Sequence, residues 1–212
     1  MTRTLGDRIK SLSELFAAES SEAMYLRLVS HWKTPDRVVI GAKEPRTHFS
    51  DSQAWADIPE LVHRMMFLDS LSYLPDDILA KVDRAAMGVS LETRVPLLDH
   101  RLAAFAWSLP LYMKVRDRRG KWILRQVLEN YVPRDLIDRP KFGFSVPIDT
   151  WLRGPLREWA ESLLDESTLR DQGYFDPAPI RQRWREHLQG TRDWHFYLWD
   201  VLMFQAWLQE TE

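Results

Sequence analysis

The chain has 212 residues, of which 45% are hydrophobic and 28% charged, and its formal net charge is -2. This length suits one large domain or two small ones, and the composition is typical of a globular protein. The near-neutral charge gives no electrostatic basis for nucleic acid as the main partner. The absence of cysteine excludes disulfides, cysteine-bound zinc and a thiol nucleophile.

Two further features limit location and fold class. No apolar run reaches the roughly 18 residues needed to cross a bilayer, and the first residues lack the apolar core of a signal peptide. We therefore expect no membrane partner and a cytoplasmic location. Only 8 glycines are present, which argues against an all-β sandwich and favours a helical protein.

The N-terminal third predicts helices followed by an irregular loop. Apolar residues recur at helical spacing through residues 1–30, with a break at Ser20-Ser21. Residues 34–56 contain prolines and small polar residues, so we expect an irregular loop with at most one short strand at Val38–Ile40.

The middle of the chain predicts a series of short helices. One helix is expected from about Ile58 to Leu74, and Pro75 begins a second one that carries an apolar stripe to Val89. Asp99 has the residue type and position of an N-cap for a further helix that Pro110 ends.

The C-terminal half continues this pattern. A basic turn at residues 116–119 and Gly120 precede another amphipathic helix, and residues 139–154 look irregular. Further helices are expected at about 155–164, 177–188 and 194–208. The sequence thus predicts a mostly α-helical protein with at most one or two short strands, folded as a single domain over residues 1–212.

The segment between the two central helices carries the first candidate site. Glu92 and Arg94 are two residues apart in a stretch that Pro96 keeps out of regular helix, so their side chains point to one side. Their apolar neighbours predict partial burial, where each charge needs a partner. Two interpretations stay open for Glu92: a structural ion network, or a carboxylate near a reaction centre. A structural role is favoured for Arg94 and Asp99.

Lys141 is the second candidate. It follows Pro140, which fixes the backbone, and precedes Gly143, which permits a sharp turn. A lysine on such a loop can present a positive charge to phosphate oxygens, although a solvated loop lysine is the simpler interpretation.

Other polar and aromatic residues have plainer interpretations. Lys81 and Asp77 are four apart, as in an exposed helical ion pair. The six histidines have no metal-ligand spacing, so we expect no metal site. The C-terminal tryptophans at 194, 199 and 207 have the spacing of packed core or interface residues, and the arginines at 181, 183 and 185 are expected to form a solvated face.

Taken in order, these motifs resemble the C-terminal part of the synthetase domain of glutamine-dependent asparagine synthetases. The matching residues run from Lys81-Val82-Asp83-Arg84, through Leu91-Glu92-Thr93-Arg94-Val95-Pro96-Leu97-Leu98-Asp99, to Arg139-Pro140-Lys141. The match is strongest over residues 58–208, and the tail WDVLMFQAWL resembles the closing helix of bacterial members.

The resemblance implies an ATP-dependent amide synthesis. In that family, ATP and magnesium activate aspartate as an acyl-adenylate, and ammonia from glutamine attacks the acyl carbon. Lys141 matches a phosphate-contacting lysine, and Glu92 matches a glutamate beside the reaction centre. Arg94, Asp99, Asp83 and Arg84 match positions that we expect to form a structural ion network.

This chain lacks two features that complete members of the family have. A complete member opens with a catalytic cysteine, whereas this chain begins Met1-Thr2-Arg3 and has none. The Ser-Gly-Gly-x-Asp-Ser loop that cradles pyrophosphate is also missing, and with it the parallel nucleotide-binding sheet. We therefore expect a C-terminal part of a larger α/β synthetase domain, inactive alone and binding neither ATP nor magnesium tightly.

Two alternatives stay open. A related synthetase could act on another carboxylate, in a β-lactam, a peptide or a polysaccharide. The chain could also be a non-catalytic helical interaction module. In a C-terminal part of the synthetase domain, helices that normally cover the nucleotide-binding sheet would expose apolar faces and favour homo-oligomers.

Overall fold

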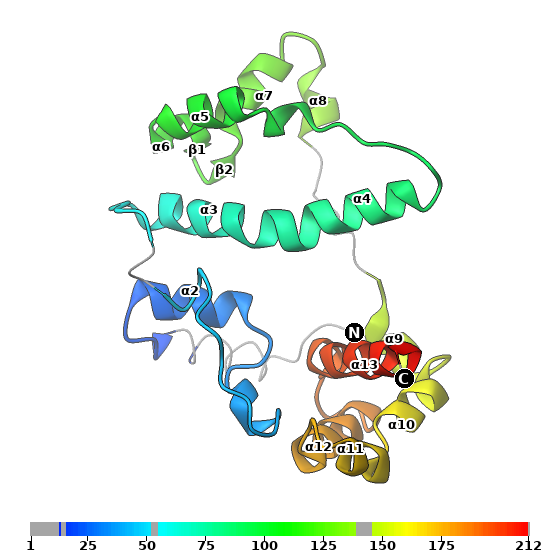
Figure 1. Cartoon of the computed structure of the whole chain (residues 1–212). Helices are drawn as coiled ribbons and strands as arrows, with labels where there is room; N and C mark the ends of the chain where they lie inside the picture. The colour runs from blue at the N-terminus through cyan, green and yellow to red at the C-terminus, as the bar shows by residue number, and fades with distance from the viewer. Residues whose placement is uncertain (1–12, 14–15, 52–54, 139–145, 212) are drawn as a thin grey trace. The chain divides into compact units, whose positions relative to one another are not determined.

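The computed structural model describes residues 13, 16–51, 55–138 and 146–211. The chain divides into two compact units, one made of residues 1–52 and 145–212 and the other of residues 53–144. Helices dominate each unit, as Figure 1 shows, which confirms the mostly α-helical prediction. Single-domain organisation over residues 1–212 stays a prediction. The two units, here called the first and the second, are described separately.

The N-terminal part of the first unit contains α2 (Ser21–Val29) and the short 3-10 helix η1 (Pro35–Arg37). The hydroxyl of Ser20 caps α2 by accepting a hydrogen bond from the Ala23 N–H at 3.0 Å, so the serine pair marks a helix start. Val39 then forms an isolated antiparallel bridge with Phe175. This bridge joins two segments that are far apart in the sequence.

Five helices make up the C-terminal part of the first unit: α9 (Ile148–Arg153), α10 (Arg157–Leu163), α11 (Glu166–Gln172), α12 (Pro177–Leu188) and α13 (His195–Thr211). The sequence predicts α10, α12 and α13 but misses α9 and α11. Helix α12 begins with proline after its N-cap Asp176, whose carboxylate accepts from the Ala178 N–H. Helix α11 also follows an N-cap aspartate, Asp165, whose carboxylate accepts from the N–H groups of Ser167 and Thr168.

These helices enclose the hydrophobic core of the first unit. Each apolar side chain buried here contributes about 1.5–3 kcal/mol relative to an exposed one. Trp184 is fully buried, and its indole N–H donates to the carboxylate of Glu161. The other core residues are Val38, Leu152, Ala160, Leu163, Leu164, Leu169, Phe175, Ile180, Leu198, Val201 and Leu202.

The predicted solvated face on α12 is wrong for two of its three arginines. Arg181 is mostly buried and donates to Glu161 and to the Leu164 carbonyl. The Arg183 guanidinium lies 4.6 Å from the ring centroid of Trp32 and 4.9 Å from that of Trp194. Aromatic rings outside α12 therefore cover Arg183, while Glu161 pairs with Arg181, and helical spacing within α12 could not reveal either contact.

The second unit opens with a single helical rod built of three segments, visible in Figure 1. The α-helices α3 (Leu61–Leu71) and α4 (Ala80–Met87) flank η3 (Tyr73–Leu79), which is π-helical. Pro75 lies inside η3. A proline cannot donate and its ring collides with the carbonyl four residues back, so the wider π turn accommodates it. The predicted helix break at Pro75 is therefore a change of helical pitch.

The rest of the second unit consists of short elements: η4 (Pro96–Leu98), α5 (His100–Ser108), α6 (Leu111–Lys114), α7 (Trp122–Leu128) and α8 (Arg134–Ile137). Strands β1 (Val115–Arg116) and β2 (Arg119–Gly120) pair antiparallel across the basic turn. Asp117 and Arg118 form that turn with positive φ, the geometry of a tight two-residue hairpin. No helix in the described ranges has the length and apolar character needed to cross a membrane.

Candidate functional site

The loop between α4 and α5 carries most of the predicted site residues. Helix α4 ends at Met87, and the N–H of its C-cap, Gly88, donates to the Arg84 carbonyl at 2.9 Å. The chain then turns through Ser90, which has a φ of 60°, and the Leu91 N–H returns to the Ala86 carbonyl. A left-handed residue with such a backward hydrogen bond is a common way to end a helix. Pro96 starts η4, so residues 91–95 stay non-helical.

Glu92 and Arg94 form an ion pair in this loop. The Arg94 Nη2 atom lies 2.6 Å from Glu92 Oε1, and the side chains are 83% and 68% exposed. The expected partial burial of the two side chains is wrong. The apolar neighbours Leu91, Val95 and Leu97 are themselves exposed, so they do not shield the charges from water.

Asp99 holds the far end of the loop. Its Oδ1 atom accepts from the Arg101 N–H at 2.9 Å, which makes it the N-cap of α5, as predicted. The Arg101 guanidinium also donates to both carboxylate oxygens, at 3.0 and 2.8 Å. These hydrogen bonds lower the pKa of Asp99. The role of Asp99 visible here is to fix the start of α5.

Asp83 and Arg84 lie on the exposed surface of α4. Their helix also begins next to the predicted ion pair, in which Lys81 Nζ lies 2.7 Å from Asp77 Oδ1. Across the described part of the second unit, the Glu92–Arg94 and Asp99–Arg101 pairs are separate from each other and from Asp83 and Arg84. An ion network that joins all of these residues stays a prediction.

Lys141 lies outside the described residues, together with Arg139 and Pro140. The last described residue before this segment, Asp138, is held by arginines from three elements. Arg125 Nη1 lies 2.8 Å from one carboxylate oxygen, and Arg119 and Arg134 each lie 3.2 Å from the other. The hydrogen bond from Arg134, with the nearby positive charges, lowers the pKa of Asp138.

Sequence reasoning did not identify this arginine cluster. The only local signal is the four-residue spacing of Arg134 and Asp138 on a short helical segment. Arg119 and Arg125 reach the same carboxylate because the hairpin and α7 fold back toward α8.

The first unit has a buried polar cluster around His187. This side chain is fully buried, and its Nδ1 atom accepts from the Trp194 N–H and lies 3.3 Å from Arg153 Nη2. Burial, together with the positive charge of Arg153, lowers the pKa of His187 to about 4. The ring is therefore neutral at pH 7, with its remaining proton on Nε2. No residue of the described ranges accepts from that atom.

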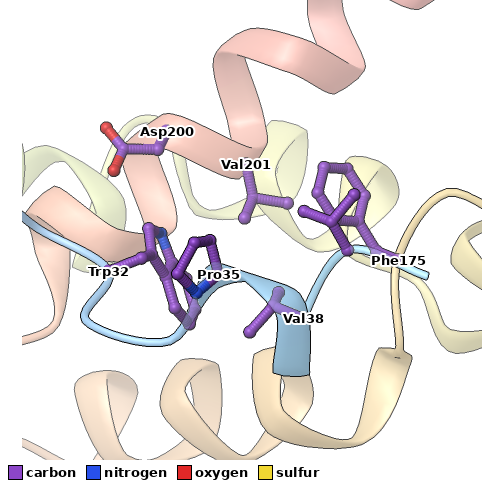
Figure 2. A pocket seen from close by; sticks show the side chains of 7 residues that line it. Trp32, Pro35, Val38, Phe175, Asp200 and Val201 are labelled. Atoms are coloured by element: carbon purple, nitrogen blue, oxygen red, sulfur yellow. The ribbon is translucent and has the colours of Figure 1, made fainter. Parts of the chain in front are cut away.

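A small pocket of about 150 Å³ is also present in the first unit. Its walls are the side chains of Trp32, Pro35, Val38, Val39, Phe175, Asp200 and Val201. Figure 2 shows the Asp200 carboxylate turned away from the apolar side chains, and it pairs instead with His31 Nδ1 at 3.0 Å. The pocket thus has apolar walls without a polar group aimed into it, which gives no basis for catalysis there.

Within the described ranges, no group of three or more Asp, Glu or His side chains converges in a way that could hold a metal ion. The carboxylates at Glu92, Asp99 and Asp138 each face an arginine instead. These residues therefore do not fit a magnesium ion by themselves.

The chain is mostly helical, and the charged side chains of the loop between α4 and α5 are exposed to solvent. A family model described as asparagine synthase matches residues 1–209, which is nearly the whole sequence. The chain belongs to the asparagine synthase family.

Its curated relatives are much longer proteins. The chain is 32% identical to asparagine synthetase [glutamine-hydrolyzing] 1 of Bacillus subtilis over 162 residues, which is 76% of this chain and 25% of that protein. It is 38% identical to a putative asparagine synthetase [glutamine-hydrolyzing] of Mycobacterium bovis over 161 residues, or 75% and 24% of the two chains. The human asparagine synthetase [glutamine-hydrolyzing] is 29% identical over 156 residues, or 64% and 26%. The chain thus spans about a quarter of each relative's length, and no solved structure gives a significant match.

Proposed function

We propose that this chain forms the C-terminal helical part of the synthetase domain of an asparagine synthetase. The reaction of the whole enzyme is the ATP-dependent amidation of aspartate through an aspartyl-adenylate, with ammonia derived from glutamine. The observation that carries the proposal is the family match over residues 1–209. The names of the relatives support aspartate and glutamine as the substrates.

In this proposal the α4–α5 loop forms one wall of the synthetase site. Glu92 lies beside the reaction centre and orients a catalytic group, and Arg94 at 2.6 Å holds its carboxylate in place. The high exposure of both side chains supports this role, because a carboxylate must be reachable by groups from the rest of the enzyme. Asp99, Asp83 and Arg84 keep architectural roles.

Lys141 contacts the phosphates of ATP in the same proposal. A cation at this position stabilises the negative charge that develops on the pyrophosphate leaving group. Magnesium, which the reaction requires in this proposal, would need ligands besides the described side chains, since within the described ranges no three of them converge on a metal site.

We further propose that the 212-residue chain alone neither hydrolyses glutamine nor adenylates aspartate. Its sequence contains no cysteine to act as the glutaminase nucleophile and no Ser-Gly-Gly-x-Asp-Ser loop to bind pyrophosphate. An ATP–pyrophosphate exchange assay on the chain with aspartate should give no turnover above a blank. Aspartate-dependent exchange by the chain alone would overturn this part of the proposal.

The site assignment is tested in the full-length polypeptide that carries this segment. Glu92→Gln should lower asparagine formation by about 100-fold or more, as expected for a group that acts in the transition state. Glu158→Gln, at an exposed position of α10, is the matched control and should leave the rate unchanged. Lys141→Ala should slow pyrophosphate release, with Lys43→Ala as its control. Equal rates for Glu92→Gln and Glu158→Gln would contradict the role of Glu92.

The same exchange assay shows which carboxylate the full-length enzyme activates. The full-length polypeptide should release pyrophosphate with aspartate and not with glutamate, peptides or β-amino acids. Exchange with one of these other carboxylates alone would favour a related synthetase of the same family.

One observation favours the non-catalytic alternative, a helical interaction module. Many large apolar side chains of the second unit are exposed, among them Met87, Val89, Leu91 and Leu97. Such a surface is typical of a face that binds another protein surface. A start site with no synthetase sequence upstream in the same reading frame would support the module over the enzyme.

A further inference from the structure

The side chain of Lys114, at the end of α6, lies in an unusual environment within the second unit. Its Nζ atom is 3.2 Å from Nε2 of His63 on α3 and 4.9 Å from the ring centroid of Trp107 on α5. The lysine is half-buried, and no carboxylate of the described residues forms an ion pair with it. Burial lowers the pKa of the Lys114 amine, which raises its neutral fraction at a given pH.

A carboxylate and an imidazole are arranged in series with this amine. Glu60 Oε2 lies 3.7 Å from Nδ1 of His63, on the side of the ring opposite Lys114. With its proton on Nδ1, His63 turns the Nε2 lone pair toward the amine nitrogen, and Glu60 lies near Nδ1 without a hydrogen bond to it. A nucleophile within hydrogen-bond distance of a base is the arrangement that activates a nucleophile.

The other groups around the amine favour the same chemistry. The ring of Trp107, which lies 4.9 Å from the Lys114 Nζ atom, packs edge to face with Phe67 at 6.4 Å between the ring centroids. The His63 side chain is only 14% exposed, so its ring is held in position. Lys81, the comparison lysine on α4, is exposed, and its hydrogen bond with Asp77 raises its pKa.

We propose that Lys114 is a covalent acyl-acceptor site that reacts with acyl phosphates, with His63 as the proton acceptor. The Lys114 nitrogen forms a bond to the acyl carbon, and the bond from that carbon to the phosphate oxygen breaks. The phosphate leaves with the electron pair, and the proton lost by nitrogen passes to His63 Nε2. The product is an Nε-acyl-lysine, and no oxidant or reductant is needed. This inference is independent of the proposed synthetase function.

Acetyl phosphate is the probe for the test. The intact chain is incubated with it near neutral pH, and the initial acetylation rate of each lysine is measured by peptide mass spectrometry. Lys114 should be acetylated several-fold faster than Lys81 in the same sample, although Lys81 is more exposed. His63→Gln, which cannot accept a proton, should reduce the Lys114 rate to the level of Lys81 and leave the Lys81 rate unchanged.

Two results would overturn the proposal. One is a Lys114 rate equal to or below that of Lys81 in the unaltered chain, which does not depend on any variant folding. The other is an unchanged Lys114 rate in His63→Gln with a far-UV circular dichroism spectrum like that of the parent. Glu60→Gln should give a smaller decrease in the Lys114 rate than His63→Gln, because Glu60 acts through the imidazole.

Discussion

The two units of the chain differ in how completely they bury their own apolar residues. The first unit encloses a core that includes Trp184, Leu198 and Leu202, all without solvent exposure. In the described part of the second unit, Leu68 is the one buried side chain, and Val89 is 76% exposed. The first unit therefore has the packing of an independently stable body. The second unit has helices whose apolar faces lack a covering surface.

This contrast agrees with the length comparison. The chain spans about a quarter of its asparagine synthetase relatives, so a long stretch of each relative has no counterpart here. The proposed function assigns the exposed apolar faces of the second unit to contacts with other parts of such an enzyme.

The largest effect is expected from a core substitution in the first unit. Trp184→Ala should lower the free energy of unfolding by about 3–5 kcal/mol, because it leaves a cavity and removes the donor to Glu161. Val89→Ala in the second unit is the control and should change it by no more than about 0.5 kcal/mol. Urea denaturation followed by circular dichroism measures both. Similar losses for the two variants would contradict the contrast.

The second prediction concerns pH and His187. Its pKa of about 4 in the folded protein is below the ordinary 6.5, so the unfolded chain binds the extra proton first as the pH falls. The stability that the neutral ring provides is fully present above pH 6.5 and is lost as the pH falls to about 4. The loss should be on the order of 3 kcal/mol.

Urea midpoints measured between pH 7 and pH 4 check this prediction. His187→Gln should flatten the pH dependence, whereas the exposed control His100→Gln should leave it unchanged. A pH slope that is the same in His187→Gln and the parent would show that other groups are responsible.

The third prediction concerns self-association through the second unit. We expect the chain to form homo-oligomers at high concentration, because its exposed apolar side chains gain free energy when covered. Leu91→Gln together with Leu97→Gln should weaken association by about 1 kcal/mol per residue, measured by light scattering. Met203→Gln in the first unit is the control. A monomer over the whole concentration range would count against an uncovered apolar face.

The smallest effect is expected at the charged loop. Arg94→Ala should change the stability of this chain by less than about 1 kcal/mol, because the pair with Glu92 is exposed and water screens it. A double-mutant cycle with Glu92→Gln measures the coupling directly. A coupling well above that value would mean that the pair is structural, which is the other interpretation of Glu92.

Much of the helical fold could be predicted from the sequence because its signals are local. Helix α12 combines an N-cap aspartate, a proline at its first position and an apolar stripe, and these fix its start at Pro177. Helices α9 and α11 are not predicted because each is only six or seven residues long and lies in a stretch of mixed polar and apolar residues without a clear apolar stripe. The π-helical turn at Pro75 was missed because the sequence indicates a break without stating how the chain accommodates it.

The site was less predictable because it depends on contacts between distant residues. The pairing of Glu92 with Arg94 follows from their two-residue spacing, but their exposure depends on surfaces that local sequence does not specify. The covering of Arg183 by Trp32 and Trp194 brings together residues far apart in the chain. The arginines around Asp138 likewise come from three separate elements.

Amide hydrogen exchange of the chain tests the central claim most directly, because it reports the stability of each helix separately. The account predicts slow exchange in α12 and α13, close to the limit set by global unfolding. It predicts much faster exchange in α4, in the loop that carries Glu92 and in α5. Equal protection of the two sets of helices in a monomeric sample would contradict the account, because the second unit would then be stable without a covering surface.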